Sequence, residues 1–143
     1  MVKMNLKKII IFLFLINFCS NLNAETNHLK EGKEFFKNKN YKKARIEFEK
    51  DIVFNPKSEE SYLYLAKIFN KEENNNLEEN NLKTVILLNP KNEEAIYRLA
   101  ILSIKKSDFS KTEELIKTFN LVCTKLCSSK KELQEKLKSS QKQ

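Results

Sequence analysis

The residues best suited to a covalent or metal-centred site are two cysteines near the end of the chain. Cys123 and Cys127 lie four residues apart, and the third cysteine, Cys19, lies far away in the N-terminal segment, just after an apolar run. If the chain is exported, as argued below, an isolated pair is typical of a disulfide. Four residues along a helix separate Cα atoms by about 6 Å, which a disulfide can span. Because helix geometry suits the bond poorly, we predict a disulfide at a helix–turn junction, with two buried free thiols as the alternative.

Other residues do not support a metal or catalytic site. A cysteine-based metal site needs about four ligands, and the single histidine, His28, is far from both cysteines in the chain. We therefore expect no metal, and we expect His28 to be a helix-face residue. No Ser-His-acid, Cys-His or paired-carboxylate arrangement, Gly-rich phosphate loop or HExxH pattern is apparent. The sequence predicts no enzyme and no cofactor, and a small envelope enzyme with an unrecognised site remains as an alternative.

The chain repeats itself with a period of 34 residues. FNPKSEE at 54–60 returns as LNPKNEE at 88–94, and the same offset aligns three small residues, Gly32, Ala66 and Ala100. A fixed period of this length is typical of stacked repeats. The chain has one glycine and two prolines, too few for a turn-rich β-sandwich or barrel. Together these features predict an all-α fold.

The spacing resembles that of the tetratricopeptide repeat, a 34-residue helix–turn–helix unit. The pattern of that family is an aromatic residue, Leu-Gly and Tyr, followed later by Ala, Phe and Pro. The segment 32–56 carries most of this pattern, and YLYLAKIF at 62–69 matches its first half. The resemblance implies a short right-handed α-solenoid, with a C-terminal capping helix and polar tail at 127–143. Its three repeats are 25–58, 59–92 and 93–126.

The small, proline and capping positions of the repeat have physical roles. Small residues let paired helices approach closely, and proline ends the second helix because it lacks the N–H and clashes with the preceding turn. Ser58 and Asn92 are predicted N-caps of the next helices. Glu59 and Glu93 then place negative charge at the positive helix ends. The residues assigned to packing within and between repeats are Gly32, Ala66, Ala100, Ala44, Phe48, Leu82, Ile116, Pro56 and Pro90.

Three departures from the pattern predict local differences. The middle repeat contains the polar run KEENNNLEENN at 71–81, which predicts a longer turn and a second helix beginning near Leu77. The third repeat lacks its proline, so its second helix is expected to run on towards Val122. A capping box that begins at Ser129 predicts a last helix at about 130–139.

The candidate binding site is the inner surface of the stack. The resemblance implies that first helices line a concave face, and lysine recurs there with the 34-residue period. Such a groove suits an extended or helical peptide with acidic groups, whereas a solvated lysine face is the alternative. Family members that clamp a C-terminal carboxylate have Asn where Lys33 and Lys67 stand, so that clamp is not supported. The predicted groove residues are Leu29, Lys33, Phe36, Lys37, Leu63, Lys67, Asn70, Lys71, Tyr97, Ile101, Ile104 and Lys105.

Residues 1–24 have the features of a secretory signal. Three lysines among the first eight residues precede an uncharged apolar run at 9–18, and a short polar segment ends at Ala24. A membrane-spanning helix needs about 20 apolar residues, and this run is about half that length. We expect cleavage after Ala24 and a periplasmic or secreted protein. An uncleaved membrane anchor is the alternative.

These features together predict a non-catalytic periplasmic adaptor or scaffold. It would bind a protein or peptide partner in the cell envelope and act in assembly of an envelope complex. Export argues against nucleic acid as a partner despite the net charge of +8. Membrane contact is expected only if the signal stays uncleaved, which would give a membrane-tethered accessory subunit. The sequence predicts neither the partner nor the oligomeric state.

Overall fold

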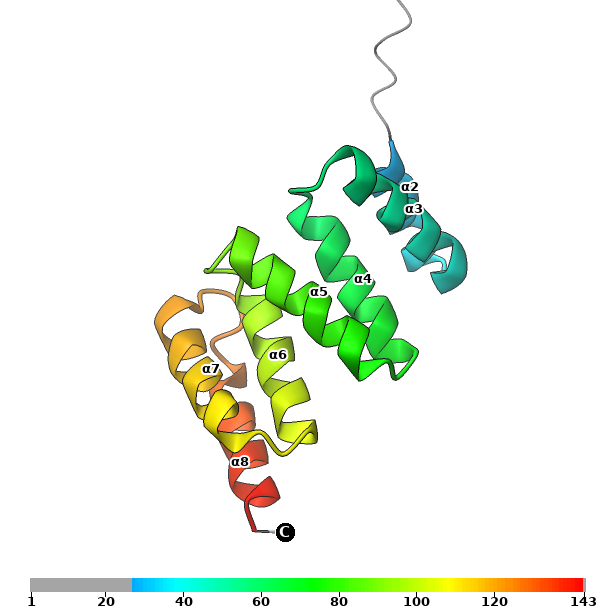
Figure 1. Ribbon diagram of the computed structural model, residues 1–143. Helices are drawn as coiled ribbons and strands as arrows, with labels where there is room; N and C mark the ends of the chain where they lie inside the picture. Colours follow the sequence, from blue (N-terminus) through cyan, green and yellow to red (C-terminus); the bar gives the residue numbers. More distant parts are fainter. Residues whose placement is uncertain (1–26, 143) are drawn as a thin grey trace, which may run out of the picture.

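The computed structural model describes residues 27–142, and its regular structure is entirely helical within that range (Figure 1). The predicted signal at 1–24 lies outside the described residues. None of the helices within 27–142 is long and apolar enough to cross a membrane. The helices are α2 (His28–Lys37), α3 (Tyr41–Phe54), α4 (Glu59–Lys71), α5 (Asn75–Leu88), α6 (Glu93–Lys105), α7 (Phe109–Val122) and α8 (Ser129–Ser140).

The helices recur with the 34-residue period of the sequence. The second helices α3, α5 and α7 each span 14 residues and begin 34 residues apart. The first helices α4 and α6 each span 13 residues and are related by the same offset. Each first helix packs against its second helix, and each second helix packs against the next first helix (Figure 1). The predicted all-α stack of helical hairpins is therefore confirmed.

The middle repeat lacks the longer turn that its polar run predicted. Helix α5 begins at Asn75, two residues before Leu77. The side chain of Asn74 caps it by accepting a hydrogen bond from the N–H of Leu77 at 3.2 Å. Glu73 adopts a left-handed φ of 56°, as do the residues 34 positions before and after it. A residue with left-handed backbone geometry therefore follows each first helix at the same position. This geometry sets the turn length despite the polar composition.

The ends of the last two helices only partly follow the sequence predictions. Helix α7 ends at Val122 as expected, but it has the same length as α3 and α5, so the missing proline does not lengthen it. The predicted capping box is wrong, because α8 already begins at Ser129 and its N-cap residue, Ser128, makes no side-chain cap hydrogen bond. Glu132 instead accepts a hydrogen bond from the hydroxyl of Tyr97 at 3.1 Å.

The two predicted N-caps behave differently. Asn92 accepts a hydrogen bond from the N–H of Ala95 at 2.8 Å, as an N-cap should. Ser58 occupies the N-cap position without such a bond. Its hydroxyl donates to Ser61, whose hydroxyl donates to the buried carboxylate of Asp51 at 2.5 Å. The chain of hydroxyls thus satisfies an acidic group inside the stack.

A close helix crossing surrounds the only glycine. A Cβ atom added to Gly32 would lie 2.6 Å from Cε1 of Phe48, which is closer than real Cβ contacts come. Phe48 is fully buried and stacks on Tyr64, with ring centroids 4.9 Å apart. Glycine is therefore required at this point because a large ring fills the space opposite it, not because of an unusual backbone angle.

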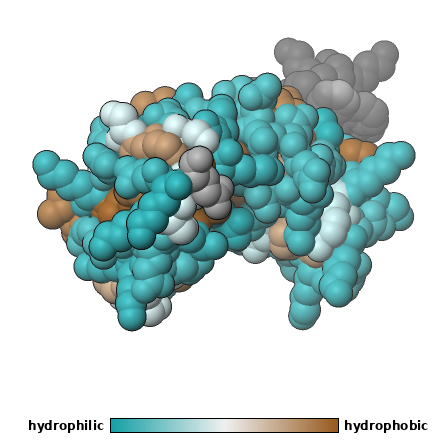
Figure 2. All heavy atoms as spheres, turned by 90° about the horizontal axis from the view of Figure 1, so that it is seen from below, coloured by the Kyte–Doolittle hydropathy of each residue, from teal (hydrophilic) through white to brown (hydrophobic). Residues whose placement is uncertain are grey.

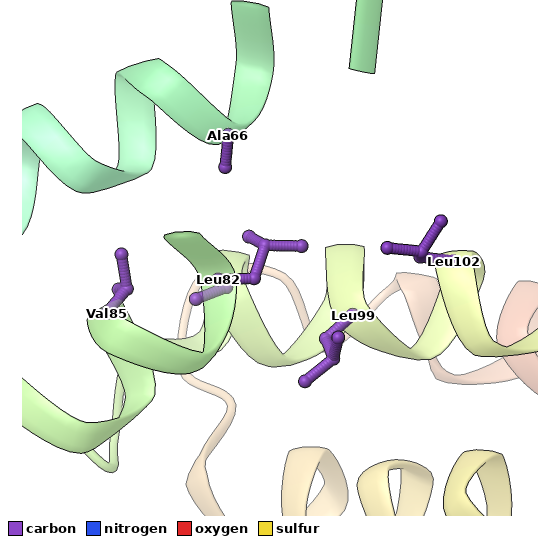
Figure 3. Close-up of a cluster of buried hydrophobic side chains, with 6 residues drawn as sticks. Ala66, Leu82, Val85, Leu99 and Leu102 are labelled. Carbon is purple, nitrogen blue, oxygen red and sulfur yellow. The ribbon is translucent and has the colours of Figure 1, made fainter. Parts of the chain in front are cut away.

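The middle of the stack is a continuous apolar core. Figure 3 shows Ala66 from α4 facing Leu82 and Val85 of α5, with Leu99 and Leu102 contributed by α6. All five residues are at most 3% exposed. The first and third repeats have similar clusters, and the third includes Leu133 and Leu137 of α8. Among residues assigned to repeat packing, seven are buried, and Pro56 and Pro90 are exposed two positions beyond their helices.

The structure pairs Cys123 with Cys127. Their Cα atoms are 5.3 Å apart. Cys123 follows directly after α7, and Cys127 lies two residues before α8. The disulfide is therefore at a helix–turn junction, where the spacing predicted it, and it constrains the segment that leads into the last helix.

Candidate functional site

Two of the predicted groove lysines are paired with glutamates of the following repeat. Nζ of Lys67 on α4 lies 2.9 Å from Oε1 of Glu94 on α6. One repeat earlier, Lys33 on α2 pairs with Glu60 on α4. Both ion pairs join successive first helices, and corresponding members are 34 residues apart. These lysines therefore contribute to contacts between repeats, and a partner would have to compete with an internal carboxylate for them.

Glu94 is held in its charged form. It also accepts a hydrogen bond from Nε of Arg98 at 2.9 Å. Burial pushes the pKa of Glu94 upward, but the hydrogen bonds from Lys67 and Arg98 outweigh burial and lower it. Lys67 in addition lies over the ring of Tyr64, with its Nζ 4.9 Å from the ring centroid. The site is thus a preorganised junction between α4 and α6.

A second row of lysines remains open to solvent. Lys37, Lys71 and Lys105 are exposed and form the last residues of α2, α4 and α6. None of the three pairs with a carboxylate of a described residue. Lysine also complements the negative end of a helix dipole, worth about 0.3–1 kcal/mol, so the row has a structural use as well. We call Lys37, Lys71 and Lys105 the inner lysine row.

Neutral side chains of the second helices support this row. Nζ of Lys71 lies 5.1 Å from the ring centroid of Tyr41. Nζ of Lys105 donates to Oδ1 of Asn75 at 3.1 Å. Tyr41 and Asn75 are both the first residues of their helices. The contacts orient the ammonium groups without neutralising them, so their charge remains available to an anionic partner.

The apolar groove residues of the first two repeats lie partly in the core. Leu29 and Phe36 pack against the first cluster, and Leu63 packs against the middle one. Phe36 meets the rings of Tyr41 and Tyr64 edge-on, with centroids 5.3 and 5.0 Å away. All of these side chains keep some exposure. They therefore form the floor of the inner surface and are not projecting contacts.

Helix α8 covers the apolar groove residues of the third repeat. Tyr97, Ile101 and Ile104 pack against the cluster that contains Leu133 and Leu137 of α8. The sequence predicts α8 only as a cap for the open end of the stack, and this overlap with the groove residues is not part of that prediction. The most exposed members of the predicted groove are consequently polar, and they are Lys37, Asn70, Lys71 and Lys105.

A small pocket lies where α4, α5, α6 and α8 meet. Its volume is about 160 Å³, and Asn70, Glu78, Tyr97 and Arg98 are among its lining residues. Glu78 is 2% exposed and accepts a hydrogen bond from Asn70 at 3.1 Å. Burial raises the pKa of Glu78, and the hydrogen bond from Asn70 and the charge of Arg98 offset this only in part. The pocket offers donors and acceptors beside the inner lysine row.

Figure 2 shows the molecule from below, with hydrophilic residues over most of that face. Hydrophobic residues appear there in small separate groups, and the lower outline is hollowed between the two ends of the stack. A partner that approached from this side would meet mainly polar and charged groups. Specific binding there would depend on ion pairs and hydrogen bonds more than on a broad apolar patch.

The glutamates that open the first helices do more than complement a helix dipole. Glu93 accepts hydrogen bonds from three consecutive backbone N–H groups, those of residues 124–126, at 2.6–3.1 Å. These bonds, led by that of residue 124, lower the pKa of Glu93. Glu59 accepts from the side chains of Asn89 and Asn92 in the equivalent turn one repeat earlier. Each glutamate thus holds the turn at the end of its own repeat.

The fold brings His28 close to two acids. Possible ligand atoms of His28, Glu31 and Glu47 all lie within 4.8 Å of one another. However, Nδ1 of His28 is 2.6 Å from Glu47, and Nζ of Lys50 is 2.8 Å from the other oxygen of that carboxylate. These contacts satisfy Glu47 within the protein and join α2 to α3. The sequence prediction of no metal weighed His28 only as a ligand beside the distant cysteines, and it did not include this cluster.

Comparisons with known proteins support the fold. No protein-family model matches the sequence, and no curated protein matches it. The Yersinia enterocolitica type III secretion translocator chaperone SycD superposes with a TM-score of 0.73 at 11% identity, covering 88% of this chain and 90% of SycD. SycD in complex with a peptide of the translocator YopD gives a TM-score of 0.69 at 11% identity. That match covers 80% of this chain and 90% of SycD.

A domain from yeast is similar to the same degree. The TPR2B domain of Sti1, solved in complex with pHsp70, gives a TM-score of 0.69 at 17% identity. The match covers 82% of this chain and 98% of that domain. Identities this low establish the architecture alone. The 34-residue helix register and these superpositions together show that the chain has the helical-repeat fold of the tetratricopeptide-repeat proteins.

Proposed function

We propose that this protein is a non-catalytic adaptor that binds an acidic segment of a protein or peptide through the inner lysine row. The observation that carries the proposal is the recurrence of Lys37, Lys71 and Lys105. They stand at the same place in three successive repeats, exposed and without a carboxylate partner among the described residues. Regularly spaced cations favour an extended chain with acidic groups over a compact ligand.

The polar groups beside this row would supply specificity. Asn70, Glu78 and Arg98 line one pocket and offer an amide, a carboxyl group and a guanidinium group. Asn70 directly precedes Lys71, and the charge of Lys105 acts on Glu78. A bound main chain could exchange hydrogen bonds with them. Complexes of two structural relatives, SycD with a YopD peptide and TPR2B with pHsp70, support a peptide or protein as the kind of partner.

We assign Lys33 and Lys67 a supporting role on the inner surface. Both are engaged by Glu60 and Glu94 of the next repeat, so we assign them to the rigidity of the surface. They remain predicted groove residues, but the first contact with an acidic partner is assigned to the inner lysine row. This division follows from which ammonium groups already have a carboxylate.

We place the adaptor in the cell envelope. The basic, apolar and small-residue pattern of residues 1–24 supports export. The Cys123–Cys127 disulfide fits an oxidising compartment. A membrane-tethered accessory subunit is the second candidate, since the same N-terminal pattern could remain uncleaved. N-terminal sequencing of the protein from cells separates the two, because a chain that starts at Glu25 contradicts the tether.

Site-specific crosslinking in intact cells tests the binding surface. A photoreactive amino acid replaces Lys71 or Lys105, and in the control it replaces Lys42, which is exposed on α3. We expect both inner positions to capture the same protein, identified by mass spectrometry, and the Lys42 position to capture none of it. Equal capture from Lys42 would contradict binding at the inner lysine row.

A further inference from the structure

The second helices carry a periodic row of exposed apolar residues. Val53, Leu87 and Leu121 are the next-to-last residues of α3, α5 and α7. They are 75%, 82% and 80% exposed. Single exposed apolar residues are common and need no explanation. Three large ones at the same place in successive repeats form an organised feature, because stacking sets equivalent positions side by side along one edge.

A row of lysines accompanies them. Lys57, Lys91 and Lys125 lie four residues further on, in the turns that follow the same three helices. All three are exposed, and within residues 27–142 none of them forms an ion pair. Unlike the inner lysine row, these lysines stand outside helices, so a helix dipole does not account for them. We call the six residues 53, 57, 87, 91, 121 and 125 the turn edge.

The described chain begins at this same edge. The ring of His28, the first residue of α2, stacks on Phe54 at the end of α3, with centroids 5.8 Å apart. Phe54 is itself 64% exposed. In Figure 1 the start of α2 and the turns after α3, α5 and α7 follow a diagonal from the top of the molecule down to its left side. The first described helix therefore begins at the edge that carries the exposed apolar residues and the lysines.

Charge and shape discriminate among possible occupants of the turn edge. A second copy of the chain would bring two lysine rows together, which like charge opposes. An acidic protein would need a complementary surface along a line of single projecting side chains, although protein interfaces have a packed apolar core. An anionic bilayer accepts both features, because apolar side chains enter the acyl boundary while lysines stay among the headgroups.

We infer that the turn edge docks on an anionic membrane surface. Val53, Leu87 and Leu121 would insert at the boundary between headgroups and acyl chains, and the three lysines would contact lipid phosphates. Because the helices of each hairpin run antiparallel, the inner lysine row lies at the opposite edge. Docking would therefore leave Lys37, Lys71 and Lys105 pointing away from the bilayer. The inference stands independently of the partner and of whether residues 1–24 are cleaved.

Tryptophan reporters test the inference in the full chain, which contains no tryptophan. Leu87→Trp places a reporter on the turn edge, and Asn38→Trp places one at the exposed end of α2, on the opposite edge. The probe is vesicles of phosphatidylglycerol and phosphatidylcholine in equal parts, compared with phosphatidylcholine alone. We expect a blue shift and quenching by brominated lipid for Leu87→Trp on anionic vesicles only. Asn38→Trp should show neither.

The site-specific readout separates this edge from the N-terminal apolar run. If vesicles bind the protein but the Leu87→Trp emission does not shift, the N-terminal apolar run and not the turn edge contacts the lipid. The inference is then wrong. Equal shifts on neutral vesicles would also contradict it, because the lysines would then contribute nothing. If an acidic polypeptide such as polyglutamate, and not anionic vesicles, shifts the Leu87→Trp emission, the edge is a protein-binding site.

Two matched charge variants complete the test. Lys57→Gln, Lys91→Gln and Lys125→Gln together remove the basic part of the turn edge. Each lysine near an anionic surface strengthens attraction roughly fivefold, so the triple variant should bind vesicles about 100-fold more weakly. The same three-charge loss in the inner lysine row, at 37, 71 and 105, should have a much smaller effect. If both triple variants lost the same affinity for anionic vesicles, net charge alone would explain the loss. That result would overturn the inference.

Discussion

Lys67 of α4 lies 2.9 Å from Glu94 of α6, and the same contact recurs one repeat earlier between Lys33 and Glu60. In each pair the lysine is 27 residues before its glutamate. The pairs link first helices that make few other contacts with each other. The two pairs join successive repeats, so we expect these charged residues to help fix the spacing of the repeats.

Reversing one charge in this pair should loosen the stack. Lys67→Glu sets two carboxylates against each other, and we expect a loss of about 1 kcal/mol in the free energy of unfolding. Adding Glu94→Lys should recover part of the loss by restoring opposite charges. Urea unfolding followed by circular dichroism measures both. Lys71→Glu, which makes the same charge change at an unpaired lysine, is the control, and a loss as large there would contradict the pairing.

Gly32 and Phe48 should behave as a coupled pair. Alanine is the better helix former by about 1 kcal/mol, yet Gly32→Ala forces a methyl group into the Phe48 ring. Overpacking of this kind costs about 1–3 kcal/mol, so we expect net destabilisation. The second repeat has Ala66 and Leu82 at the equivalent places, both fully buried. Gly32→Ala combined with Phe48→Leu copies that pair.

A double-mutant cycle measures the coupling between residues 32 and 48. The double variant should lose less stability than the sum of the two single losses, because the smaller leucine leaves room for the new methyl group. Thermal unfolding of the three variants supplies the cycle. Strict additivity would show that Phe48 does not limit the size of residue 32.

Glu79 should make stability depend on acid pH. It accepts hydrogen bonds from Lys106, Lys111 and Lys83 at 2.5–2.8 Å, and these bonds, led by Lys106, lower its pKa well below the usual range. A carboxyl group with a lowered folded-state pKa stabilises the protein above its unfolded pKa of about 4.3. That stabilisation is lost as the pH falls through this value towards the folded-state pKa.

Urea unfolding across the acid range tests the assignment. We expect Glu79→Gln to be less stable than the parent at pH 7 and to show a flatter decline below about pH 5. Glu78→Gln is the contrasting variant, because burial raises the pKa of Glu78. The folded protein disfavours the charged carboxylate of Glu78, so Glu78→Gln should raise the free energy of unfolding at pH 7. Parallel pH profiles for parent and Glu79→Gln would rule out this role for Glu79.

The short disulfide loop should contribute modestly and locally. Closing a loop of about five residues is worth roughly 2 kcal/mol in the chain-entropy description. Replacing Cys123 and Cys127 by serine should lower the free energy of unfolding by at most that amount. Amide hydrogen exchange should speed up more in α8 than in α4. Uniformly faster exchange throughout the chain would mean that the bond stabilises the whole stack.

The repeat period and packing residues could be predicted from the sequence because they depend on local pattern. Gly32, Ala66 and Ala100 recur at one spacing, and burial of the equivalent residues follows from stacking. The predicted start of α5 is two residues late because a polar run is typical of a loop, although Asn74 caps the helix and a left-handed residue fixes the turn. Composition did not reveal that backbone geometry.

The candidate site was harder to predict because it depends on which side chains meet across repeats. Lysine periodicity alone could not separate Lys33 and Lys67, which are paired, from the inner lysine row. The recurrence of a lysine and a glutamate 27 residues apart, at 33 and 60 and again at 67 and 94, was a signal that could have done so. The covering of the third repeat by α8 had no comparable signal, since Leu133 and Leu137 suit any helix that packs on one face.

The proposed division between two lysine rows is tested most directly with the partner recovered by crosslinking. Its affinity is measured by calorimetry for the parent, for Lys37, Lys71 and Lys105 changed together to Gln, and for Lys57, Lys91 and Lys125 changed together to Gln. Both triples lose the same charge. We expect the first triple to bind at least tenfold more weakly and the second to bind like the parent. Equal affinity of the first triple and the parent would contradict the proposal that the inner lysine row is the binding site.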